Sequence, residues 1–161
     1  MKRLTVLSAV STAALAAAAI AMASSMATIH TAHTKIGTVL VSSNGHTLYL
    51  LQGDSAPHFE CTGKCLAFWP PLMATGKVTV AGGANASLVG TVKRGSGKQV
   101  TYKGHPLYWF ANDSKAGQTN GEGIELSGKY WWALGPSGAP VTTAKKSTAP
   151  SSSGGGSNSG W

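Results

Sequence analysis

The chain has 161 residues and a formal net charge of +8, from 13 basic and 5 acidic side chains. That length accommodates one modest domain, and five carboxylates leave little room for chemistry that needs several acids, such as two-metal phosphoryl transfer or calcium binding. Charged residues make up 11% of the chain, less than half of the usual fraction of about 25%, and the 21 glycines indicate many turns and short strands rather than helices.

The first 27 residues are typical of a secretory signal peptide. Lys2 and Arg3 form a positive start, an uncharged alanine-rich stretch follows, and Ala23 and Ala27 each end a small-residue cleavage motif. An uncleaved membrane anchor is the alternative, because the apolar stretch is long enough to cross a bilayer. Cleavage is favoured because the stretch is only weakly hydrophobic. We therefore expect a secreted, extracellular or cell-envelope-associated protein without an integral membrane span after signal removal.

The composition after the signal predicts three segments. Residues 28–35 are polar and are expected to form a lead-in. Residues 36–141 have the composition of a globular domain. Residues 142–161 are rich in Ser, Gly and Ala and cannot bury a core, so they are expected to be a disordered tail.

Short runs of Val, Thr, Leu and aromatic residues, broken by Gly, Asn and Pro, predict strands within the domain. Asn44-Gly45 predicts a two-residue hairpin turn, since both residue types accept a positive φ, and Lys103-Gly104 predicts a second tight turn. Residues 111–123 are polar and predict a loop. The expected strands are 36–42, 46–52, 88–93, 99–103, 105–111 and 129–134.

An internal repeat divides the domain into two related units. Residues 45–54 match residues 104–113 position by position. Two units of this size are expected to pack together, because neither buries enough surface alone. We therefore predict an all-β fold in which two pseudo-repeats form a small sandwich or barrel. Looser echoes relate 36–39 to 89–92 upstream and 69–72 to 131–134 downstream.

The second copy contains Tyr108, Phe110 and Asp113, and the first contains Tyr49 and Asp54 with Leu51 at the aromatic position. This spacing resembles the Tyr-x-(Phe/Trp/Tyr)-x-x-Asp motif of a secreted-repeat family of predicted bacterial lipoproteins. The likeness covers most of residues 36–138, including the cysteine pair and the Trp-Pro-Pro-Leu segment after it. The resemblance implies a secreted repeat but no particular reaction. The chain has no cysteine before Cys61 and therefore no lipobox.

The motif residues have two interpretations. Positions i and i+2 of a strand share a face, so each tyrosine and the third motif residue should form a pair of core side chains. Asp54 and Asp113 follow where the strand should end, and there an aspartate can accept backbone N–H bonds and form a turn. The alternative is an acid/base pair of carboxylates, as in glycosidases.

Cys61 and Cys65 are expected to form a disulfide, because exported proteins fold in an oxidising compartment. Such a small loop contributes about 2 kcal/mol in the chain-entropy model. The alternative is a copper or redox site in which the two thiolates act with His58 and Met73. Thioredoxin-like chemistry is not indicated, since the spacing is C-x₃-C and no βαβ pattern surrounds it.

Trp131 and Trp132 are adjacent and must point to opposite faces of a strand. One is expected in the core, while the other is a candidate for stacking on a sugar or binding a partner protein. Neither a nucleophile elbow nor a phosphate-binding loop is present.

The sequence therefore predicts an exported, non-enzymatic β domain of the bacterial cell envelope that serves as a binding or structural module without a cofactor. The expected partner is an anionic cell-wall polymer or an envelope protein rather than a specific nucleic acid, because the basic residues are dispersed along the chain. The alternatives are a small copper-binding or redox protein and, less favoured, a hydrolase.

Overall fold

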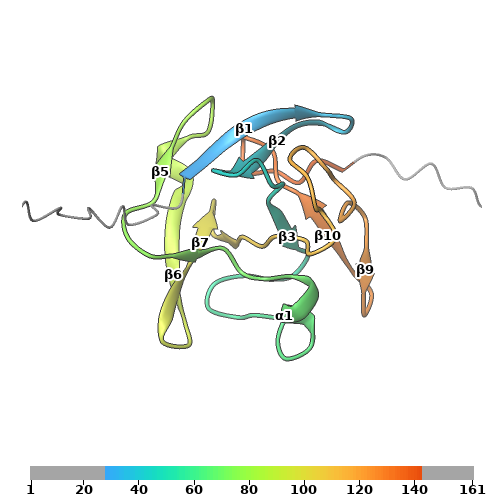
Figure 1. Ribbon diagram of the computed structural model, residues 1–161. Helices are drawn as coiled ribbons and strands as arrows, with labels where there is room; N and C mark the ends of the chain where they lie inside the picture. The colour runs from blue at the N-terminus through green and yellow to red at the C-terminus, as the bar shows by residue number, and fades with distance from the viewer. Residues whose placement is uncertain (1–27, 143–161) are drawn as a thin grey trace, which may run out of the picture.

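A computed structural model describes residues 28–142, which form short strands with very little helix (Figure 1). The predicted signal peptide and almost all of the predicted tail lie outside the described residues. No helix in the described part is long and apolar enough to cross a membrane. The strands are β1 (Thr28–Thr34), β2 (Gly37–Ser42), β3 (Tyr49–Leu51), β4 (Met73–Ala74), β5 (Thr79–Val80), β6 (Val89–Arg94), β7 (Gly97–Tyr102), β8 (His105–Pro106), β9 (Glu125–Leu126) and β10 (Lys129–Ala133), and the helices are α1 (Cys65–Phe68) and a 3₁₀ turn (Ala86–Leu88).

The strands form three small sheets. Their orders are β2-β1-β5, β3-β10-β9 and β4-β7-β6, and β8 pairs with β7. All pairings within these sheets are antiparallel except the short contact of β1 with β5. The predicted all-β class with two repeats is confirmed, and the described strands do not close into a barrel.

Each repeat begins with a hairpin and ends with a strand that joins the other repeat. The hairpins are β1–β2 and β6–β7, each with six residue pairs in register. After the first hairpin comes β3, which pairs with β10 of the second repeat. In turn, β4 of the first repeat pairs with β7 of the second. The two repeats therefore exchange their last strands.

Matching hydrogen bonds show that the exchange is symmetric. The Leu72 N–H donates to the Leu107 carbonyl at 2.9 Å, and the Leu134 N–H donates to the Leu48 carbonyl at 3.0 Å. At the centre, Tyr49 and Tyr108 exchange both backbone hydrogen bonds, at 2.9 and 3.0 Å. A pseudo-twofold axis therefore passes between the two motif tyrosines.

Residues 28–35, expected to be a lead-in, instead contain β1. Thr and Ile are β-branched and favour strands, and Ile29 is fully buried. β2 pairs with residues 29–34 of this segment along one edge, and β5 pairs with Thr28 and Ile29 along the other, which satisfies part of its backbone. Most of β1 is only half-buried, so the segment carries polar side chains and lacks the apolar pattern that predicts a strand.

The turn after β2 is one residue longer than expected from Asn44-Gly45. The Gly45 N–H donates to the Ser42 carbonyl at 2.8 Å, the Ser42 N–H donates to the His46 carbonyl at 2.9 Å, and Gly45 has a φ of +80°. The equivalent turn after β7 has two residues, Lys103 and Gly104, both at positive φ. Residues 36–39 are not equivalent to 89–92 in the fold, because 37–39 lie in β2, the second strand of the first hairpin, whereas 89–92 lie in β6, the first strand of the second hairpin.

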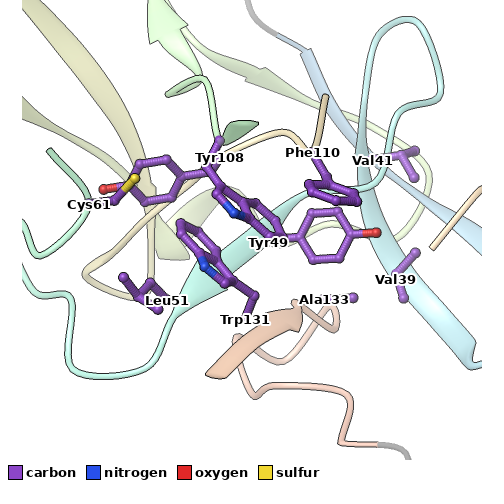
Figure 2. Close-up of a cluster of buried hydrophobic side chains, with 10 residues drawn as sticks. Val39, Val41, Tyr49, Leu51, Cys61, Tyr108, Phe110, Trp131 and Ala133 are labelled. Carbon is purple, nitrogen blue, oxygen red and sulfur yellow. The ribbon is translucent and has the colours of Figure 1, made fainter. Parts of the chain in front are cut away.

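Two clusters of buried side chains fill the interior. The first lies on the pseudo-twofold axis and contains both motif tyrosines with Trp69, Phe110 and Trp131 (Figure 2). The second is mainly aliphatic and takes equivalent residues from both repeats: Ile29, Leu40, Leu48, Leu50, Leu72, Val100, Tyr102, Leu107 and Leu134. The core is therefore shared between the repeats rather than divided between them.

Candidate functional site

The tyrosine of each motif copy bonds the aspartate of the other copy. The Tyr49 hydroxyl donates to Asp113 Oδ2 at 2.6 Å, and the Tyr108 hydroxyl donates to Asp54 Oδ2 at 2.5 Å. Both tyrosines are fully buried. The motif therefore forms two reciprocal bonds across the pseudo-twofold axis.

The second oxygen of each aspartate holds its own loop. Asp54 Oδ1 accepts the Glu60 N–H at 2.5 Å, and Asp113 Oδ1 accepts the Asn120 N–H at 2.9 Å. The aspartates thus accept backbone N–H bonds, as expected, but they close loops of six and seven residues rather than a tight turn. Asp54 is 3% exposed and Asp113 is 1% exposed.

The environment keeps both tyrosines in their neutral form. Burial raises the pKa of Tyr49 well above its usual range, and the hydrogen bond to the Asp113 carboxylate raises it further. Burial and the bond to Asp54 raise the pKa of Tyr108 in the same way, although the nearby Arg94 guanidinium opposes part of that effect. Each tyrosine therefore acts as a fixed donor to a carboxylate.

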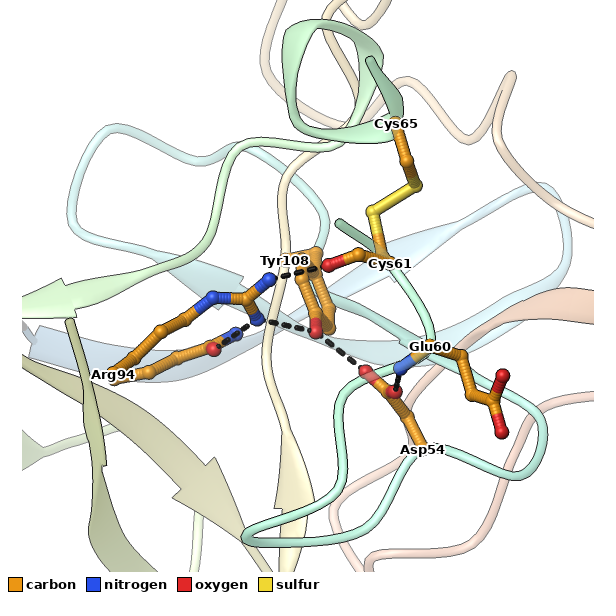
Figure 3. The surroundings of a disulfide bond; sticks show 7 residues. Asp54, Glu60, Cys61, Cys65, Arg94 and Tyr108 are labelled. Atoms are coloured by element: carbon orange, nitrogen blue, oxygen red, sulfur yellow. Dashed lines mark hydrogen bonds between the residues drawn. A yellow bond between two sulfur atoms is a disulfide. The ribbon is translucent and has the colours of Figure 1, made fainter. Parts of the chain in front are cut away.

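Arg94 distinguishes the second tyrosine from the first. Its guanidinium donates to the Tyr108 hydroxyl and to Gln99 Oε1, both at 2.7 Å, and to the Cys61 carbonyl (Figure 3). It also lies 4.3 Å above the centre of the Phe59 ring. Sequence reasoning missed this residue. The available signal was that Arg94 is the only arginine after Arg3.

Cys61 and Cys65 form the predicted disulfide, with 5.4 Å between their Cα atoms (Figure 3). Both sulfurs are bonded to each other, so the predicted copper set of Cys61, Cys65, His58 and Met73 offers no thiolate in this state. Among the described residues no group of three or more His, Cys, Asp or Glu side chains is arranged to hold a metal ion. Copper binding stays a prediction, and it applies to the reduced protein.

Trp131 was a candidate for surface binding, but it is fully buried. Trp131 lies opposite Leu51 of β3, so both side chains project from the same face of the sheet into the first cluster. The Trp131 ring stacks on Trp69 with 3.8 Å between ring centres and 3° between planes. Trp132 points away from that core and is half-buried. With Tyr130, it lines a cavity of about 510 Å³ that also includes Leu50, Gln52, His105 and Pro140.

The other hollows on the described surface include one apolar and one basic hollow. One, of about 260 Å³, is apolar; Phe68, which is 58% exposed, lines it together with Cys65, Trp69 and Phe110. The other, of about 550 Å³, lies beside β6 and β7, and Lys77 and Lys98 line it. Sequence reasoning did not identify either, because each is assembled from segments that are distant in the chain.

Comparison with known proteins gives one match. A family model described as a secreted repeat of unknown function matches residues 30–73 and residues 90–134. Each match contains one motif tyrosine and one motif aspartate and reaches the exchanged strand of its repeat. No curated protein and no solved structure matches the chain.

Proposed function

The chain belongs to this family of secreted repeats, and from that premise we propose that it is a non-enzymatic binding or structural module of the bacterial cell envelope. The family description agrees with the export predicted from the first 27 residues. The envelope is where an exported module with an excess of basic side chains meets anionic polymers.

The burial of the motif carboxylates carries this proposal. A general acid or base must come within hydrogen-bond reach of its substrate, whereas Asp54 and Asp113 are 3% and 1% exposed. In each carboxylate, one oxygen bonds a tyrosine and the other bonds a backbone N–H. The tyrosine and aspartate side chains that recur in both copies therefore hold the repeats together, which leaves the surface for binding.

The remaining acids support the same interpretation. Glu60 forms a salt bridge with Lys129 at 2.6 Å, Glu122 accepts the Ala133 N–H at 2.8 Å, and Glu125 accepts the Gly128 N–H at 3.0 Å. Each of the five carboxylates thus has a structural bond. A pair of free carboxylates that flank a substrate, as in glycoside hydrolysis, has no counterpart among these contacts.

The test is co-sedimentation of the exported, full-length protein with isolated bacterial envelopes, combined with assays for soluble sugar and phosphate. We expect saturable, reversible binding and no product. Asp113→Asn should lower the free energy of unfolding by about 1 kcal/mol, while molecules that stay folded should bind with unchanged affinity.

Two results would contradict the proposal. One is binding no stronger than that of a heat-unfolded sample, which would remove the module function. The other is the release of product at a rate proportional to protein concentration. If Asp113→Asn abolished that release without unfolding the protein, the motif would be catalytic.

A further inference from the structure

The cleft beside β6 and β7 concentrates positive charge. Lys77 and Lys98 line it and are exposed. Lys93 lies directly opposite Lys98 in the β6–β7 register, so these two side chains project from the same face of the sheet. Two lysines therefore line a cleft of about 550 Å³, and Lys93 adds a third positive charge on the same face of the sheet.

Among the described residues, no carboxylate lines this cleft. The salt bridge found among residues 28–142 joins Lys129 and Glu60, and neither residue lines the cleft. Asp54 and Asp113 are buried on the pseudo-twofold axis. Like charges directly opposite each other in a sheet are destabilising, so the Lys93–Lys98 arrangement does not serve the stability of the hairpin.

The rest of the lining suits an extended anion. The exposed Thr91 contributes a hydroxyl that can donate a hydrogen bond. β6 is an outer strand of its sheet, and its residues Val89, Gly90 and Thr91 form one wall of the cleft. The segment from Ala74 to Val78, which leads from β4 to β5, forms the other wall.

The side chains that line the cleft indicate which class of anionic partner it binds. Single-stranded nucleic acids are usually bound by aromatic side chains on which bases stack, and no aromatic residue lines this cleft. Membrane surfaces are usually bound through exposed apolar side chains, and the large exposed apolar residue of the described part, Phe68, lines a different hollow. Lysine acts as a point charge that binds phosphate without the planar geometry of arginine–carboxylate pairs.

We propose that the cleft lined by Lys77, Thr91 and Lys98, with Lys93 at its side, binds a flexible polyanionic envelope polymer through its phosphodiester groups. This inference rests on the proposed function as an envelope-binding module. It adds the site and the ligand chemistry, and it assigns the unfavourable lysine pair a role in binding.

The test uses fluorescence anisotropy with a labelled glycerol phosphate oligomer and the full-length protein. Lys77→Gln/Lys98→Gln should weaken binding about tenfold or more, because charge-assisted hydrogen bonds are lost. The matched control is Lys35→Gln/Lys115→Gln, which removes the same charge from two exposed lysines elsewhere. It should weaken binding by less than about twofold. Lys98→Gln alone should keep or raise the melting temperature, which separates loss of binding from loss of folding.

Several outcomes would overturn the inference. Equal losses in both double variants would show that binding follows net charge rather than the cleft. Tighter binding of single-stranded DNA or of phosphatidylglycerol vesicles would assign the cleft to a different partner. If the oligomer does not bind but the protein still co-sediments with envelopes, the proposed function stands and this site assignment fails. If neither binds, both fail.

Discussion

The reciprocal bonds between Tyr49 and Asp113 and between Tyr108 and Asp54 explain why the same tyrosine-to-aspartate spacing occurs in both copies of the repeat. In the first copy, Tyr49 begins β3 and Asp54 follows three residues after the strand ends at Leu51. The two side chains of one copy therefore sit at opposite ends of a short segment. The pseudo-twofold axis brings each beside the complementary residue of the other copy. The tyrosine and the aspartate of each copy therefore serve to pair that copy with the other one.

The raised pKa values of Tyr49 and Tyr108 predict a loss of stability in alkali. Both pKa values lie above the usual value of about 10, so the unfolded chain releases these protons first as the pH rises. Below about pH 10 both tyrosines are neutral in either state and their contribution is constant. Above it, the free energy of unfolding should fall by up to about 1.4 kcal/mol per pH unit for each tyrosine, as measured by urea unfolding.

The phenylalanine variants provide the control. Tyr49→Phe or Tyr108→Phe should remove about half of the alkaline decline, since one of the two tyrosines no longer titrates. At neutral pH each variant should also lose about 1–3 kcal/mol, because a buried carboxylate loses a donor. An unchanged alkaline slope in both variants would show that other groups cause the decline.

At the scale of elements, the sequence predicted the strands that carry strong apolar alternation and missed those that depend on a partner. β7 and β10 lie where expected, and Lys103-Gly104 forms the expected turn. β1 was missed because its Thr and His side chains are polar, and β4 has only two residues. Such segments become strands through pairing with β2 and β7, which local composition does not encode.

The disulfide next to α1 gives a prediction at this scale. Cys61→Ser/Cys65→Ser should lower the free energy of unfolding by about 2 kcal/mol, since the bridge restricts a small loop in the unfolded chain. The fold should persist, because Arg94 bonds the backbone carbonyl of Cys61 rather than its sulfur. Urea unfolding of the oxidised wild type and the variant measures the difference. Equal stabilities would contradict this role for the bridge.

At the scale of the whole molecule, the sequence showed two repeats but not how they combine. The matching segments 45–54 and 104–113 established the duplication, and nothing local to either one shows that β4 and β10 cross over. The candidate site was hidden for the same reason. Asp54 and Tyr108 are 54 residues apart in the chain, and Arg94 comes from a hairpin outside the motif.

Strand exchange predicts that neither repeat folds alone. If the chain is cut between the exposed residues Gly82 and Gly83, each half loses a partner strand. The first half keeps β3 but lacks β10, and the second half keeps β7 but lacks β4. Separately, the halves should show no cooperative thermal transition, whereas an equimolar mixture should recover the near-ultraviolet circular dichroism of the intact chain. A cooperative transition in either half alone would contradict the shared core.

The exchange of β4 and β10 also has a consequence for copy number. A chain with one copy would present its final strand as an unpaired edge, which promotes self-association, and the same bonds would then form between two molecules as a swapped dimer. Adding a third copy to this chain would restore that open edge. The architecture is therefore complete only at an even number of copies, whether these are joined in one chain or supplied by two.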